Sequence, residues 1–79
     1  MPILYKTFEI SPAPEFLVDS GKWTLRTLIT RHNDNDTFEG FFSGKNLFDF
    51  KEQAELNSIE YAKQIIDGIN PEHSLKGFL

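Results

Sequence analysis

One stretch of twenty residues, 49–68, carries the only long helical period in the chain. At about 100° per residue, its apolar and small side chains gather on one half of the helical wheel. Asp49 has the side chain of an N-cap with Glu52 three residues later, and Gly68 suits the left-handed position that ends a helix. The stretch predicts one amphipathic helix, with Leu56 as an apolar exception on its exposed half. The residues expected on the buried half are Phe50, Ala54, Ser58, Ile59, Tyr61, Ala62, Ile65, Ile66 and Ile69.

The length of 79 residues predicts a single domain, 1–79, with a core over about 3–69 and a tail over 70–79. A chain this short buries only roughly 60–65% of its unfolded surface, so its stability must come from packing the helix on a sheet. The sequence has no cysteine, which excludes disulfides and zinc–thiolate sites. Its eight Phe, two Tyr and one Trp are more than one small core needs.

Three segments, 3–10, 22–32 and 37–43, have the alternation and the β-branched or aromatic content of strands. Two prolines within 11–14 mark a loop, because proline is excluded from central strands. Residues 15–18 form a short apolar piece before the second strand. These elements predict an α+β fold, in which an antiparallel β-meander of three or four strands packs one long C-terminal helix on one face.

The polar turn 33–36 would pair His32 with Thr37, and the register of the central hairpin follows from it. Leu28 then lies directly across from Phe41, and Gly40 gives the helix room to approach the sheet. The side chains assigned to the helix side are Trp23, Leu25, Ile29, Phe38 and Phe42. The opposite face carries an apolar cluster of Tyr5, Leu28 and Phe41 inside a polar surround.

The charge of the chain argues against several classes of partner. The formal net charge is −4 and the basic residues are scattered, whereas a nucleic-acid binder needs clustered Lys and Arg. No apolar run approaches the roughly 18 residues of a membrane span, and the N-terminus lacks the pattern of a signal peptide. We therefore expect a cytoplasmic protein that binds neither nucleic acid nor membranes.

No group of residues has the pattern of a catalytic or metal site. The segment 32–36 is rich in Asn and Asp, but a calcium loop counted from Asp34 would need Gly at its sixth position and Glu at its twelfth, where Glu39 and Lys45 stand. His32 and His73 are far apart in the sequence and neither belongs to a nucleophile motif. We expect a protein without catalytic residues, metal or cofactor.

The strand and helix pattern resembles small uncharacterised bacterial single-domain proteins with a three-stranded antiparallel sheet and a C-terminal helix. The resemblance covers roughly residues 5–69 and is specific at Trp23 and at Ala62 to Gly68. It implies the fold and no catalytic residue. A weaker resemblance is to HicB-like antitoxin domains, whose strands run into a helix that begins with a Glu-Ala pair. The nearest match to that pair here is Glu52-Gln53-Ala54.

These observations predict a small non-enzymatic interaction module. One helix covers one face of the sheet, so Tyr5, Leu28 and Phe41 on the other face are the candidate interaction surface. The expected partner is a second copy of the chain, as a homodimer, or another protein. The alternative is a HicB-like antitoxin or regulatory domain, which would bind a small basic toxin.

Overall fold

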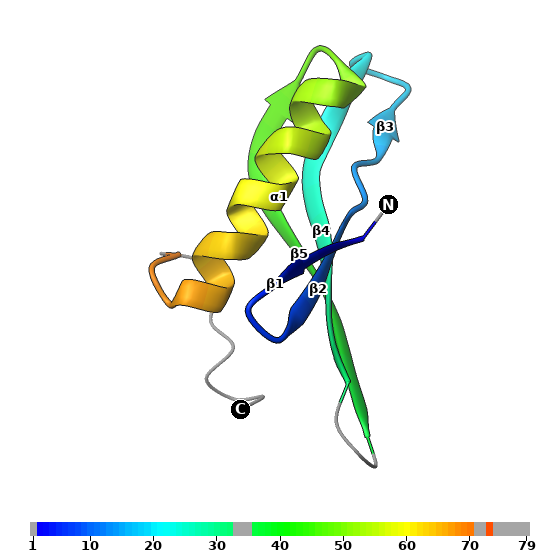
Figure 1. The fold of residues 1–79 in the computed structure, drawn as a ribbon. Coiled ribbons are helices and arrows are strands. Elements are labelled where there is room, and N and C mark those ends of the chain that lie inside the picture. Colours follow the sequence, from blue (N-terminus) through cyan, green and yellow to red (C-terminus); the bar gives the residue numbers. More distant parts are fainter. Residues whose placement is uncertain (1, 33–35, 71–72, 74–79) are drawn as a thin grey trace.

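The described part of the chain folds into one five-stranded antiparallel sheet with a single helix on one side of it (Figure 1). The computed structural model describes residues 2–32, 36–70 and 73. The elements are β1 (Ile3–Tyr5), β2 (Phe8–Pro12), β3 (Phe16–Leu17), β4 (Lys22–His32), β5 (Thr37–Phe48) and α1 (Lys51–Asp67). The predicted α+β class, antiparallel sheet and C-terminal helix are confirmed, with five strands in place of three or four.

Strand β4 is the centre of the sheet. One of its edges pairs with β5 along almost its whole length, and the other edge pairs first with β2 and then with β3. The predicted hairpin register is confirmed, because Leu28 lies opposite Phe41 and His32 lies opposite Thr37. The predicted turn 33–36 lies outside the described residues except for Asp36, as does most of the predicted tail.

The predicted first strand, 3–10, is two strands. The chain reverses at Lys6 and Thr7, so that β1 folds back on β2 and Tyr5 pairs with Phe8. Lys6 takes a positive φ of 56°, which a non-glycine residue adopts mainly in tight turns. Because the segment carries none of the usual Gly or Asn turn residues, its periodicity alone indicated a continuous strand.

Strand β5 continues five residues beyond the predicted end at Ser43, to Phe48. Between Thr24 and Arg26 the register with β4 shifts, and the extra residues of β5 lie around Gly44. A Cβ on Gly44 would lie 2.6 Å from Leu25 Cδ2 and 3.2 Å from Tyr61 Cζ. Gly44 is therefore the position where β5 approaches the helix closely, whereas a Cβ on Gly40 would meet the rings of Phe38 and Phe42.

The two ends of the helix differ in how well the sequence predicted them. Gly68 has a φ of 78° and its N–H donates to Ile65 O, as predicted for the C-terminal position. At the other end the N-cap position belongs to Phe50, and no side chain caps it. Asp49 is not the N-cap: because β5 runs on to Phe48, the Asp49 carboxylate lies next to Lys22 and forms an ion pair with it.

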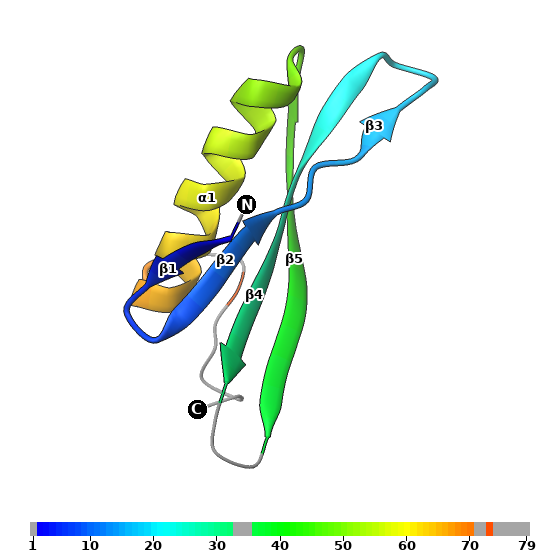
Figure 2. The same ribbon diagram turned by 45° about the vertical axis from the view of Figure 1, so that its right-hand side comes forward.

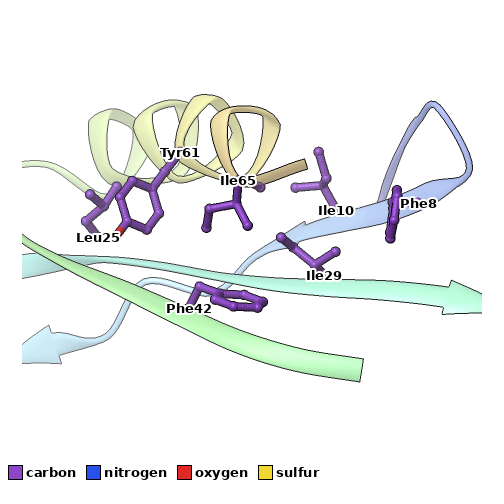
Figure 3. Packing of buried hydrophobic residues seen from close by; sticks show 8 residues of the cluster. Phe8, Ile10, Leu25, Ile29, Phe42, Tyr61 and Ile65 are labelled. Carbon is purple, nitrogen blue, oxygen red and sulfur yellow. The ribbon is translucent and has the colours of Figure 1, made fainter. Parts of the chain in front are cut away.

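The core lies between α1 and the facing side of the sheet (Figure 3). The helix buries Ala54, Ser58, Tyr61, Ala62 and Ile65, as its periodicity predicted, and Leu56 is exposed. The sheet contributes Phe8, Ile10, Leu25, Ile29 and Phe42. The predicted burial of Phe50 and Ile69 is wrong, because these residues lie just beyond the two ends of the helix and are 64% and 71% exposed.

We expect the helix to depend on its buried apolar side chains. Ile65 is 1% exposed and Leu56, on the same helix, is 66% exposed. Ile65→Ala should lower the free energy of unfolding by about 2–4 kcal/mol through lost burial and the cavity left behind. Leu56→Ala is the matched control and should change it by less than about 0.5 kcal/mol. Urea unfolding measures both, and equal effects would contradict the packing described here.

Gly44 gives a second test of the packing. Gly44→Ala places a methyl group against Leu25 and Tyr61, and we expect overpacking to destabilise the fold by about 1–3 kcal/mol. Lys45→Ala, at the exposed next position, is the control and should have little effect. Thermal unfolding of the two variants checks this, and a Gly44→Ala protein as stable as the wild type would show that β5 can move away from the helix.

Candidate interaction surface

The helix covers only one side of the sheet. The molecule measures 42 × 25 × 17 Å along its principal axes, and its thinnest dimension suits one helix layer on one sheet. A view from another angle shows α1 on one side and no described element on the other (Figure 2). We call the uncovered side the open face. By strand alternation and register it carries Glu9, Ser11, Thr24, Arg26, Leu28, Thr30, Glu39, Phe41 and Ser43.

Leu28 and Phe41 lie side by side in the middle of the open face, as the sequence predicted. They are opposite one another in the register of β4 and β5, with Leu28 half-buried and the Phe41 ring 54% exposed. The guanidinium of Arg26 lies 4.1 Å from the centroid of the Phe41 ring, within range of a cation–π contact. Arg26 Nη1 is also 3.3 Å from Glu15 Oε1. An aromatic side chain at the centre is thus bordered by charged groups.

Tyr5, the third residue predicted for this surface, lies on the helix side. Its hydroxyl donates a 2.8 Å hydrogen bond to Asp67 Oδ2 in the last turn of α1. The prediction counted Tyr5 along one continuous strand, but the reversal at Lys6 changes the face on which it lies. Leu4, opposite Glu9 in the register, takes a place on the open face and is 75% exposed.

One end of the open face has an apolar hollow that the sequence did not predict. Its volume is about 450 Å³. Leu47 lies opposite Thr24 and Leu17 lies opposite Lys22, so both belong to the open face. The strand predicted from the sequence ends at Ser43, so the prediction did not identify Leu47 as a strand residue that faces the same side as Leu17. The residues that line the hollow are Phe16, Leu17, Val18, Asp19, Ser20 and Leu47.

A cluster of charged and polar groups holds the C-terminal end of the helix against the β1–β2 turn. Asp67 accepts hydrogen bonds from Lys6 Nζ and from Tyr5 Oη, and the Lys63 Nζ lies 5.4 Å from the Tyr5 ring centroid. The hydrogen bonds from Lys6 and then Tyr5 lower the pKa of the Asp67 carboxyl, while the pKa values of Lys6 and Tyr5 are raised by the same contacts. This cluster fixes the helix on the sheet and lies away from the open face.

The two histidines lie in different surroundings. His32 is at the far end of β4, with its Nε2 3.7 Å from Glu9 Oε2. His73 packs edge-on against Phe42 and Tyr61, and its Nε2 is 2.9 Å from the carbonyl oxygen of Ser43. Within residues 2–32, 36–70 and 73, no three His, Cys, Asp or Glu side chains are grouped as a metal site would require.

Comparison with known proteins identifies no relative: no family model, curated protein or solved structure matches the chain. In the part of the chain that the structure describes, no helix is long and apolar enough to cross a membrane.

The Asp67 cluster predicts how stability depends on pH. A carboxyl whose pKa is lowered by folding stabilises the folded state above its ordinary pKa of 3.8, and this contribution is lost as the pH falls through the lowered value. Asp67→Asn should therefore lower the melting temperature near neutral pH, and the difference from wild type should shrink in acid. Asp19→Asn, at an exposed turn, is the control. If the difference in melting temperature between Asp67→Asn and wild type did not change with pH, the charge of Asp67 would not be what stabilises the fold.

Proposed function

We propose that this protein is a small non-enzymatic interaction module whose binding surface is the open face of its sheet. The observation that supports this most directly is the exposed Phe41 ring, which lies beside Leu28 at the centre of a sheet face that no described element covers. An apolar centre inside a polar and charged border is the usual anatomy of an association surface. The hollow beside Leu47 extends the apolar part of this surface toward one end.

The occupant that suits this surface best is a second copy of the chain. Two open faces stacked about 10 Å apart would form a sheet-on-sheet sandwich with one helix on each outer side. The two longer dimensions, 42 and 25 Å, set an upper limit of about 1,000 Å² on the area of this face, and the roughly 800 Å² per partner of a standard interface fits within that limit. The border also contains both signs of charge, in Arg26 and Glu15 for example, so one copy can complement another.

The HicB-like reading remains the alternative, and the net charge of −4 is the observation that favours it, since an acidic protein attracts a small basic partner. Nucleic acid is a less suitable partner. Three of the basic side chains, Lys6, Lys22 and Arg26, lie next to carboxylates of the same chain and form no free basic patch. We accordingly propose a protein partner rather than a nucleic acid or a membrane.

Self-association can be tested by changing the centre of the open face. We expect the wild type to be a dimer by sedimentation equilibrium or multi-angle light scattering, and Phe41→Lys to convert it to a monomer, because a charge would replace a buried ring. Leu56→Lys introduces the same charge at an exposed apolar position on the helix and should leave the dimer intact. Circular dichroism confirms that both variants fold.

Two results would contradict this proposal in different ways. A wild type that stays monomeric at high concentration would exclude the homodimer. A dimer that Phe41→Lys leaves intact would show that the copies associate through another surface. Co-purification of a small basic protein with the wild type, lost in Phe41→Lys, would favour the antitoxin-like alternative over the homodimer.

A further inference from the structure

A second hollow lies on the helix side, away from the open face, between α1 and the last part of β5. Its volume is about 280 Å³. It is close to the register shift at Thr24 and Arg26, where the extra residues of β5 separate this strand from β4. Leu25, Phe48 and Tyr61 supply its apolar wall, and Figure 3 shows Leu25 and Tyr61 side by side under the helix. The hollow thus has a floor made by the core itself.

The polar wall of this hollow is rich in carboxamides. The chain has seven Asn and Gln residues, and four of them line the hollow. They come from three separate parts of the chain, since one is on β5, two are on α1 and one follows the helix. These four are Asn46, Asn57, Gln64 and Asn70. Residues far apart in the sequence therefore place carboxamide groups around the same hollow.

Several of these groups keep hydrogen-bonding capacity for a ligand. The side chain of Asn46 has no hydrogen-bond partner among the described residues. Asn57 Nδ2 donates to Gln53 O, which leaves its side-chain oxygen as an acceptor. Gln64 Oε1 accepts from Asn70 Nδ2 at 3.4 Å, which leaves Gln64 Nε2 as a donor. The lining of the hollow therefore offers both hydrogen-bond donors and hydrogen-bond acceptors to a ligand.

The charge of the lining indicates which ligands are suitable. Among the described lining residues, Glu60 is the one with a charged side chain, and its Oε1 lies 3.8 Å from Lys63 Nζ, which is not part of the lining. A carboxylate accepts hydrogen bonds, and the described lining presents no cation that would bind an anion. A hydroxyl group both donates and accepts, so a ring with several hydroxyls matches a wall of carboxamides and one carboxylate. The size of the hollow, at the lower limit of ligand pockets, suits a single sugar ring.

We infer that this hollow is a binding site for a neutral, polyhydroxylated ligand of monosaccharide size. The apolar wall packs against the face of the sugar ring that presents C–H bonds. The hydroxyls of the ring are bound by Asn46, Asn57, Glu60 and Gln64. The site lies on the helix side, so it does not depend on the proposed function of the open face, and a dimer formed through the open faces leaves it accessible.

The test is an NMR titration of the ¹⁵N-labelled protein with D-glucose, D-galactose and N-acetyl-D-glucosamine in turn. We expect at least one sugar to bind with a Kd on the order of 1–10 mM and to shift the amide signals of residues that line the hollow. D-glucuronate, which differs from glucose by a carboxylate, should bind more weakly because of Glu60. Asn46→Ala and Gln64→Ala should each weaken binding by about fivefold or more.

Gln53→Ala is the matched control, since this residue carries the same group on the same helix but does not line the hollow. All three substituted side chains are exposed, so folding is not at risk. The inference is overturned if no neutral sugar shifts the lining signals up to about 50 mM, if glucuronate binds as well as glucose, or if Gln53→Ala weakens binding as much as the lining variants.

Discussion

The close contact between α1 and β4 is the interaction on which the rest of the fold depends. Ala54, Ser58 and Ala62 recur every four residues on the helix and are fully buried, so the helix backbone can lie directly over the sheet. Ser58 Oγ accepts a hydrogen bond of 3.2 Å from the backbone N–H of Arg26, at the level where β2 has ended and β3 has not begun. A small polar side chain thereby satisfies a backbone donor that the sheet does not pair.

This contact also explains the composition of the core. Because the side chains at the centre of the buried helix face are small, the large side chains lie around them. Ile65 lies toward one end of the helix, and Tyr61 lies toward β5. From the sheet, Ile10 and Ile29 pack against the helix, and both are fully buried. Thr27 is also fully buried. Among the described residues, its hydroxyl oxygen is the one buried side-chain polar atom without a hydrogen-bond partner.

The sequence predicted the elements that have a long and regular period. The helix, its buried side and its end at Gly68 follow from a repeat of 3.6 residues, and the register of Leu28 with Phe41 follows from the length of one turn. It did not predict the reversal at Lys6, because no Gly or Asn marks that turn, or the continuation of β5 past Gly44, because Gly44 and Asn46 are typical turn residues. The error at Tyr5 follows from that reversal. The carboxamide hollow has no local signal, because its residues meet only in the folded chain.

The hydrogen bond from Tyr61 has a further consequence for the behaviour of the protein in a crowded cell. Strand β5 lies at the edge of the sheet, and an exposed edge is a template for edge-to-edge aggregation. The carbonyl oxygen of Ser43 has two acceptor positions; the Tyr61 hydroxyl donates to it at 3.1 Å, and His73 Nε2 lies 2.9 Å from the same oxygen. A foreign strand that added to β5 would meet the charge of Glu39 on one side of Phe41 and this occupied carbonyl on the other. Tyr61, a core residue, therefore uses an acceptor on β5 that an added strand would need.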